Sequence, residues 1–206
     1  NHPYILRVDK LGGVYKSIDE RISEKSLFIT QEFFDGKHIY EYNFTDNEEL
    51  LKKIIVQLLD VLNYLHQSNY IYYDLKGDNI LLNISNDSPE IRLIDFGLTS
   101  HYFDEQNEIK GTAKYLAPEL FIKKRADYRV DYFSLGVLLY RIIYGEYPFK
   151  GENQIDIYRA CLSGELIFSQ SDFSGEMISV IKRLLSHNPD DRYSNPLQII
   201  NDLNIT

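Results

Sequence analysis

The chain has one cysteine, one methionine and no tryptophan in its 206 residues. Because Cys161 has no second cysteine to pair with, neither an internal disulfide nor a cysteine-based zinc site can form within the chain. The longest apolar runs, such as 135–140, fall far short of the roughly 18 residues that suggest a membrane span. We therefore expect no membrane contact through this chain, and the single thiol favours a reducing, cytoplasmic setting.

Basic residues are also scarce. The chain has 22 Lys and Arg against 31 Asp and Glu, which gives a formal net charge of -9. Nucleic-acid surfaces recruit clustered Lys and Arg, and the sequence has no such cluster. We expect no nucleic-acid partner and interpret the acidity as favouring solubility.

The length allows one substantial core, because 206 residues with 44% hydrophobic content are too few for two comfortable domains. The sequence begins with Asn1 instead of Met, and no basic-then-apolar leader follows. From these features we expect the chain to be a piece excised from a longer protein.

Alternation of apolar and polar residues predicts two strands in the first 31 residues. The segments are Tyr4–Val8 and Leu27–Gln31, joined across Gly12–Gly13 and a polar stretch. Helical periodicity then predicts a buried helix over about 47–66, with Asp46 and Glu49 as its capping box.

The rest of the chain is mainly helical in pattern. Helices are predicted at about 131–144, 154–163, 175–186 and 195–203. Short strands are predicted at 70–72, 80–82 and 91–94, with a turn over 83–90. The expected fold class is therefore α+β, mostly α-helical, with a small β-rich region around the polar residues described next.

The segment Tyr72–Asn79 and the following Asp95–Gly97 carry a linked set of polar side chains. Phosphoryl transfer from a metal-bound nucleotide needs a carboxylate to accept a hydroxyl proton, a cation beside the migrating group, and an amide and a carboxylate to hold magnesium. Asp74, Lys76, Asn79 and Asp95 are residues of these types. A tight acidic turn in a non-enzyme is the alternative for one motif, but the linked set favours catalysis.

The set resembles the catalytic loop and metal-binding motif of eukaryotic-type protein kinases, and Lys76 is the variant typical of serine/threonine kinases. The resemblance implies that Asp74 accepts the substrate proton and that Lys76 neutralises charge on the γ-phosphate. It implies ATP and Mg²⁺ as cofactors, with Asn79 and Asp95 as metal ligands. The implied reaction transfers the ATP γ-phosphoryl group to a Ser or Thr hydroxyl of a protein substrate.

The same resemblance implies where the nucleotide base would bind. Gln31 would be the gatekeeper, and the Glu32 carbonyl and Phe34 N–H would face adenine. Leu81 would form the apolar floor beneath the base, resting on the predicted helix over 131–144.

The segment 98–114 resembles an activation loop, and Thr112 resembles the loop threonine that bonds Asp74 and Lys76. In most of the family an arginine precedes the catalytic aspartate, whereas here Tyr73 stands there. The resemblance therefore implies that this chain lacks the arginine that would pair with a phosphorylated activation loop.

Three residues outside the loop resemble supporting positions. Glu119 and Arg192 resemble a buried ion pair that ties the end of the activation loop to the C-terminal helices. Asp131 resembles the carboxylate that bonds backbone N–H groups of the catalytic loop, and its alternative role is that of a simple N-terminal helix carboxylate.

The chain contains no Gly-rich loop and no strand lysine of the V-A-I-K type. By resemblance, 1–31 is the remnant of an N-lobe, 32–36 the hinge and 37–206 the C-lobe, so the missing N-lobe is an expected partner. We expect exposed apolar faces on the two remaining strands and negligible activity from the chain alone. A pseudokinase or docking scaffold without phosphoryl transfer is the alternative function.

Overall fold

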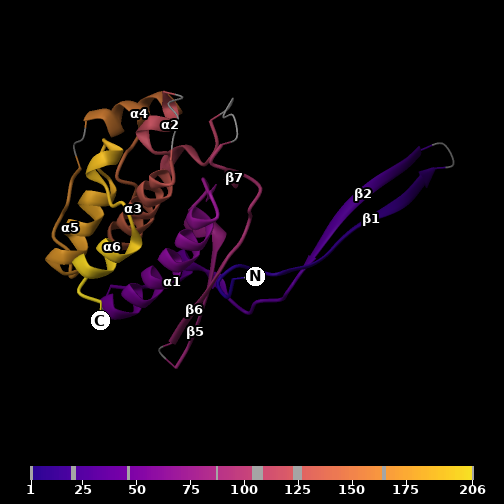
Figure 1. The fold of residues 1–206 in the computed structure, drawn as a ribbon, viewed down its shortest axis with the longest axis horizontal. Helices are drawn as coiled ribbons and strands as arrows, with labels where there is room; N and C mark the ends of the chain where they lie inside the picture. The colour runs from indigo at the N-terminus through magenta and orange to yellow at the C-terminus, as the bar shows by residue number, and fades with distance from the viewer. Residues whose placement is uncertain are drawn as a thin grey trace.

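A computed structural model gives the fold. It describes the backbone of residues 2–19, 22–45, 47–86, 88–103, 109–122, 127–163 and 166–205. Side chains are described for the same residues except 13–27. The fold is α+β, as the sequence predicted: helices gather on one side, small antiparallel sheets lie beside them, and a long hairpin projects outward (Figure 1).

The projecting hairpin pairs β1 (Val8–Asp19) with β2 (Ile22–Gln31) in antiparallel register. Apolar side chains near its base are exposed: Leu11 is 69% and Ile29 is 61% accessible. The exposed apolar surface that the sequence predicted is confirmed at these residues. A two-stranded hairpin is marginally stable by itself, so this surface is suited to packing against a further protein element.

The first strand begins later and runs further than the sequence predicted. Residues 4–7 precede β1, and Ile5 forms a parallel bridge with Leu93. Gly12, which the sequence analysis placed in the connection, lies inside β1 opposite Phe28. A Cβ at Gly12 would collide with the Phe28 ring, so this glycine makes room for a cross-strand ring instead of ending the strand.

Helix α1 (Glu48–Gln67) matches the predicted helix closely. Its N-cap is Asn47, whose side chain accepts a hydrogen bond from the Leu50 N–H at 3.0 Å. The predicted capping box began at Asp46, which lies outside the described residues. Leucine and isoleucine side chains at spacings of three and four bury one face of α1 against the core.

Two small sheets contact α1. The first has the order β3-β5-β6, formed by β3 (Lys37–His38), β5 (Ile80–Ser85) and β6 (Ser88–Leu93). The second pairs β4 (Tyr70–Ile71) with β7 (Ser100–His101), a strand that the sequence analysis missed. The turn predicted over 83–90 is wrong in extent, because β5 and β6 continue through it on both sides of Asn86, whose φ is 51°.

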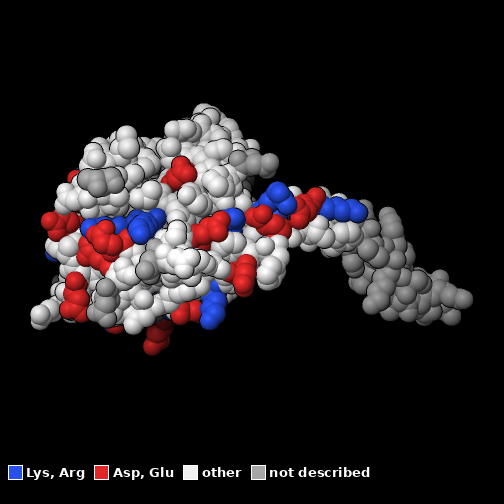
Figure 2. All heavy atoms as spheres, turned by 90° about the horizontal axis from the view of Figure 1, so that it is seen from below, with Lys and Arg blue, Asp and Glu red and all other residues white. Residues whose placement is uncertain are grey.

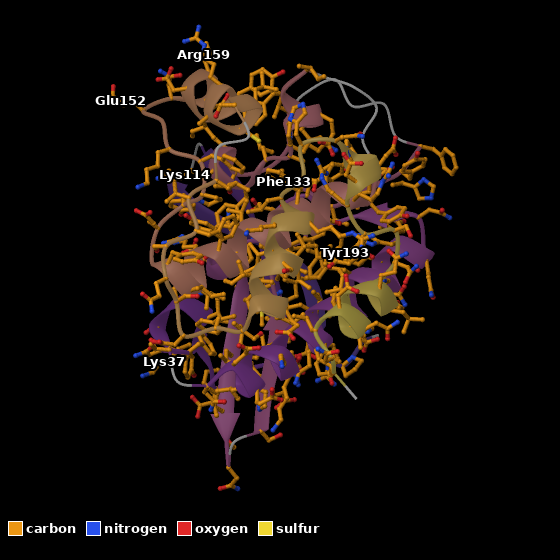
Figure 3. All side chains as sticks on the ribbon, turned by 90° about the vertical axis from the view of Figure 1, so that its left-hand side faces the viewer. Lys37, Lys114, Phe133, Glu152, Arg159 and Tyr193 are labelled. Carbon is orange, nitrogen blue, oxygen red and sulfur yellow. The ribbon has the colours of Figure 1, made fainter. Side chains whose placement is uncertain are left out.

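The helical part is built around α3 (Arg129–Tyr144), in which every residue from Val130 to Tyr140 is buried. An apolar surface on all sides is what a central helix needs. Figure 3 shows Phe133 of this helix inside the bundle. The other helices of the bundle are α2 (Pro118–Phe121), α4 (Gln154–Ser163), α5 (Gly175–Leu184) and α6 (Pro196–Asp202). Short 3₁₀ turns lie at Ile39–Glu41, Gly77–Asn79, Ala113–Tyr115 and Pro189–Asp191.

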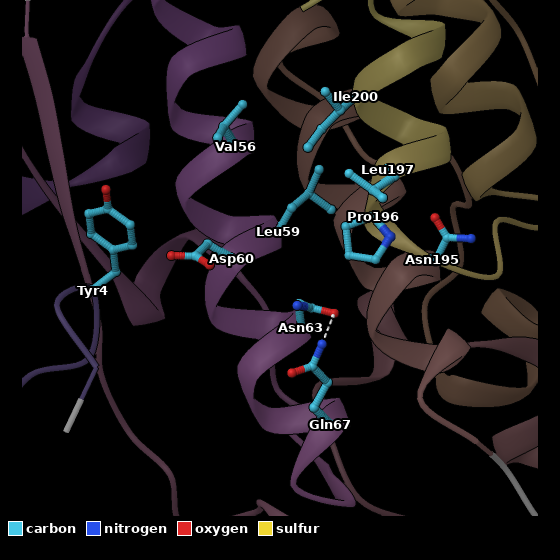
Figure 4. A pocket seen from close by; sticks show the side chains of 10 residues that line it. All are labelled: Tyr4, Val56, Leu59, Asp60, Asn63, Gln67, Asn195, Pro196, Leu197 and Ile200. Atoms are coloured by element: carbon cyan, nitrogen blue, oxygen red, sulfur yellow. Dashed lines mark hydrogen bonds between the residues drawn. The ribbon is translucent and has the colours of Figure 1, made fainter.

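The surface carries a groove of about 500 Å³ between α1 and α6 (Figure 4). Val56 and Leu59 line it from α1, and Leu197 and Ile200 line it from α6. On the face seen in Figure 2, Lys and Arg side chains are interleaved with Asp and Glu. Among the described residues, no helix combines the length and apolar character that crossing a bilayer requires.

A buried ion pair joins the start of α2 to the loop before α6, where the sequence predicted it. Arg192 Nη1 and Nη2 donate to the two carboxylate oxygens of Glu119 at 2.7 and 2.8 Å. The remaining guanidinium hydrogens are used by the carbonyls of Ser186, Arg129 and His187. All five Arg192 donors are therefore satisfied inside the protein.

Replacing Glu119 with Gln should leave the buried Arg192 charge without its counterion. We expect the free energy of unfolding to fall by about 3–5 kcal/mol in urea denaturation. The exposed pair between Lys150 and Glu146, at 2.6 Å, supplies the control. Glu146→Gln should cost less than about 1 kcal/mol. Equal losses in the two variants would contradict the role given to the buried pair.

Candidate active site

The catalytic-loop segment brings four of the predicted side chains into direct contact. Asp74 Oδ2 accepts hydrogen bonds from Lys76 Nζ at 2.7 Å and Asn79 Nδ2 at 3.0 Å. Asp74 Oδ1 accepts from Thr112 Oγ1 at 2.8 Å, and Lys76 Nζ also donates to Thr112 Oγ1 at 2.9 Å. The contacts expected of Thr112 are present. One carboxylate is thus held in a fixed position by three side chains.

These contacts control the charge of Asp74. Burial by itself raises the pKa of this carboxyl, but the hydrogen bonds from Lys76 and Thr112 and the charge of Lys76 outweigh that effect. The pKa of Asp74 is therefore below its ordinary value. The group is a carboxylate at neutral pH and can accept a hydrogen bond from a hydroxyl.

Asp131 supports the loop from beneath. Its Oδ2 accepts from the Tyr72 N–H at 3.0 Å, and its Oδ1 accepts from the Tyr73 N–H at 2.8 Å. His66 Nε2, at the end of α1, lies 2.8 Å from Asp131 Oδ2. Asp131 is completely buried, so these contacts stand in for water. The contact with the loop backbone that the sequence predicted is present, and His66 was not anticipated.

The backbone beside Asp74 has an unusual conformation. Tyr73 has a φ of 68°, and Asp95 has a φ of 60°. A bulky residue rarely adopts this left-handed region, and such strain persists only where surrounding contacts impose it. For Tyr73 the imposing contact is its N–H bond to Asp131. These two left-handed residues lie beside Asp74 and at the predicted metal ligand.

Asn79 and Asp95 lie at the ends of neighbouring strands. The Ile94 N–H donates to the Asn79 carbonyl at 3.0 Å, which places the Asp95 backbone next to Asn79. The amide nitrogen of Asn79 is committed to Asp74, so its Oδ1 is the atom left for another partner. Asp95 is exposed, with Oδ1 accepting from the Gly97 N–H at 3.1 Å. An amide oxygen and a carboxylate suit Mg²⁺, which takes few protein ligands and fills its shell with phosphate and water oxygens.

Phe96 packs edge-on against the ring of Tyr72, with centroids 5.3 Å apart. The Tyr72 hydroxyl donates to the Ile94 carbonyl. The aromatic pair therefore connects the catalytic-loop segment to the segment that carries Asp95.

The predicted hinge is fixed to the sheet by polar contacts. Gln31 ends β2, and the next residue, Glu32, accepts from the Arg7 N–H at 3.1 Å and from Arg92 Nε at 3.3 Å. The Arg7 N–H bond is the main cause of the lowered pKa of Glu32. Arg92 also lies over the Phe34 ring, 4.8 Å from its centroid. Arg92 was missed by sequence reasoning because nothing local distinguishes it from other strand residues.

Leu81 lies in the central strand of the β3-β5-β6 sheet and pairs with His38 of β3. It is half-buried, whereas its neighbours Ile80 and Leu82 are fully buried on the opposite face. Leu81 thus faces the hinge side of the sheet. The predicted contact of Leu81 with α3 stays a prediction.

The start of the predicted activation loop is attached to the body of the protein. Ser100 is buried in β7, and its Oγ accepts a hydrogen bond from Lys110 Nζ. The same amine lies 5.9 Å from the centre of the Tyr73 ring. Residues 104–108 of the segment lie outside the described residues.

The sequence matches the protein kinase domain over residues 1–203. The chain belongs to this family. The kinase domain resembles serine/threonine-protein kinase ULK3 of Xenopus laevis, which is 30% identical over 94% of the chain and 41% of that protein. It also resembles the probable serine/threonine-protein kinase 2 of Plasmodium falciparum, with 32% identity over 93% of the chain and 37% of that protein.

A third relative is the calcium/calmodulin-dependent protein kinase cmkA of Emericella nidulans, which is 34% identical over 93% of the chain and 46% of that protein. The chain spans about two fifths of the length of the first two relatives and slightly more of the third. The fold, the family and the Asp74 contacts agree on a kinase domain of the eukaryotic type, and the first two of these relatives are named as serine/threonine kinases.

Removing the Thr112 hydroxyl should raise the pKa of Asp74, because one hydrogen bond to the ionised form is lost. A lowered folded-state pKa stabilises the fold above the unfolded-state pKa, and this contribution disappears as pH falls through the folded-state value. In Thr112→Val the acid transition should therefore move to higher pH. An NMR titration of the Asp74 carboxyl measures its pKa, and Thr30→Val, which removes a hydroxyl from the hairpin, is the control. An unchanged pKa in Thr112→Val would contradict the assignment.

Proposed function

We propose that the protein carrying this kinase domain is a serine/threonine protein kinase that transfers the γ-phosphoryl group of ATP to a protein hydroxyl. The observation that carries the proposal is the Asp74 carboxylate, ionised and held by Lys76, Thr112 and Asn79. A docking scaffold would have no need for this arrangement. The serine/threonine relatives support the same substrate class.

Asp74 would orient the substrate hydroxyl and accept its proton. Its lowered pKa keeps it ionised for hydrogen bonding, and the proton moves as the oxygen bonds to phosphorus. Lys76, fixed between Asp74 and Thr112, would place its charge beside the transferred group. Thr112 would hold the two together, so its role is in positioning.

ATP and Mg²⁺ are the cofactors that this site fits. Asn79 Oδ1 and the Asp95 carboxylate would hold the metal, whose chemistry is to neutralise charge on the phosphate oxygens. The Glu32 carbonyl and Phe34 N–H, on a hinge tied down by Arg92, would hold the base above Leu81. Gln31 would border the base pocket as the gatekeeper.

Residues 1–206 alone should have negligible activity. They supply the proton acceptor and metal ligands but contain no Gly-rich loop or strand lysine to hold the phosphates. The exposed apolar surface of the β1–β2 hairpin is suited to packing against an N-lobe that would provide them. Loss of such transition-state contacts lowers the rate by orders of magnitude.

The test is Mg·ATP-dependent phosphorylation of a Ser/Thr peptide library by the full-length protein that carries this chain. Asp74→Asn should lower the rate by about 10²–10⁴-fold, because the proton acceptor is lost. Asp172→Asn, at an exposed position far along the sequence from the loop, is the control and should leave the rate unchanged. Residues 1–206 alone should give no detectable product.

Two results would count against the proposal. Equal rates for the wild type and Asp74→Asn would remove Asp74 from the chemistry. Absence of transfer by the folded full-length protein, with Mg·ATP and any Ser or Thr peptide, would favour the scaffold.

A further inference from the structure

Arg141, near the end of α3, differs from the other described arginines in its partners. Each of the other six forms an ion pair with a carboxylate; they are Arg7, Arg92, Arg129, Arg159, Arg183 and Arg192. Within the described part of the chain, Arg141 has no such partner. In a protein of net charge -9, a half-buried arginine without a carboxylate requires an explanation.

Three tyrosines hold the Arg141 side chain in place. Its guanidinium carbon lies 4.0 Å from the centre of the Tyr40 ring and 4.5 Å from that of Tyr147. Its Nη1 donates to the Tyr115 hydroxyl at 3.1 Å and to the Tyr147 hydroxyl. Both bonds use Nη1, so in the described structure the Nε and Nη2 edge makes no hydrogen bond. That edge carries two parallel N–H donors and can bind a carboxylate or a phosphate in bidentate fashion.

The tyrosines do not cancel the charge that they hold. Burial raises the pKa of Tyr40 to about 12, and burial also raises the pKa of Tyr115. Both hydroxyls are therefore protonated and neutral at physiological pH. A second cation, Lys114 Nζ, lies over the Tyr147 ring at 4.4 Å from its centre. The cluster formed by Arg141, Lys114, Tyr40, Tyr115 and Tyr147 is thus a positive site, here named the Arg141 site.

The Arg141 site adjoins the catalytic loop. The ring of Tyr40 packs so closely on Gly77 that a Cβ there would collide with it, and Gly77 lies between Lys76 and Asp78. Tyr115 follows Thr112 by three residues, and Thr112 bonds Asp74 directly. A cavity of about 250 Å³ opens beside the site, lined by Tyr40 and Arg141 together with Ile39, Tyr42, Ile142 and Gly145. A peptide whose hydroxyl reaches Asp74 would pass within side-chain reach of Arg141.

We propose that the Arg141 site binds an anionic side chain of the peptide substrate, either a carboxylate or a phosphate ester, close in sequence to the residue that is phosphorylated. The inference rests on the proposed kinase activity and adds a substrate class to it. Arg141 supplies an unused bidentate edge, and Lys114 supplies a second charge. The exposed carboxylate of Asp78 in the same loop would act against an anionic side chain and favour a basic one.

The test uses the full-length protein with peptide arrays in which positions around the Ser or Thr carry Glu, phosphoserine, Gln or Lys. At one position, Glu or phosphoserine should lower KM about tenfold relative to Gln, because the contact is a charge-assisted hydrogen bond remote from the reacting atoms. Comparing Glu with phosphoserine shows which anion the site prefers. In Arg141→Gln this preference should disappear, so that the KM values of the Glu, phosphoserine and Gln peptides become equal.

Arg141→Lys keeps the charge but loses the bidentate edge, so it should keep only part of the preference. Arg159→Gln removes a positive charge from α4 and is the matched control. Figure 3 shows Arg159 well away from Lys114. Arg159→Gln should retain the full preference. If Arg141→Gln fails to fold, as judged by its thermal transition, Lys114→Ala and Tyr147→Phe should each weaken the preference.

The outcomes separate this inference from the proposed function. The wild type could phosphorylate peptides without favouring an anion, or Arg141→Gln could keep the preference. Either result would refute the role given to the Arg141 site and leave the kinase activity standing. A preference for Lys over Glu at the same peptide position, lost in Asp78→Asn, would also overturn the inference. If no peptide is phosphorylated, the proposed activity fails, and fluorescence anisotropy of labelled Glu and Gln peptides still tests anion binding directly. Equal affinity of both peptides would then exclude the site.

Discussion

One buried carboxylate, that of Asp131, determines the geometry of the candidate active site. It accepts the N–H groups of Tyr72 and Tyr73 and contacts His66, while lying on the central helix α3. A buried carboxylate without such donors would be costly, so the loop and the helix stabilise each other. The left-handed backbone of Tyr73 follows from this attachment. Asp74, the next residue, is thereby directed to Lys76, Asn79 and Thr112.

The surroundings divide into parts that are fixed by the core and parts that depend on what binds. Asp74 is buried and bonded to three side chains, so its position is set before any ligand arrives. Asp95 is exposed, and so are Leu11 and Ile29 at the base of the β1–β2 hairpin. This contrast fits the proposed function, in which a preorganised Asp74 would accept the proton and a bound nucleotide and an N-lobe would complete the site.

The sequence predicted the contacts around Asp74, because Asp74, Lys76 and Asn79 lie within a few positions of one another and Thr112 stands where the family resemblance places the loop threonine. The central helices were also predictable from periodicity. Prediction failed where tertiary packing decided the outcome: Gly12 was assigned to a connection although it accommodates the Phe28 ring. His66 and Arg92 were missed because their roles depend on partners about 60 residues away. The tyrosine surroundings of Arg141 appear only in three dimensions.

The most direct test of this account is amide hydrogen exchange of Tyr72 and Tyr73 in Asp131→Asn. Asparagine keeps the shape but offers one acceptor oxygen and an NH₂ group, so at least one loop N–H loses its partner. Exchange at one or both amides should accelerate about 10–100-fold relative to the Ile181 amide, which lies in the buried interior of α5 and reports global unfolding. Unchanged exchange at both loop amides would contradict the claim that Asp131 holds the catalytic loop in place.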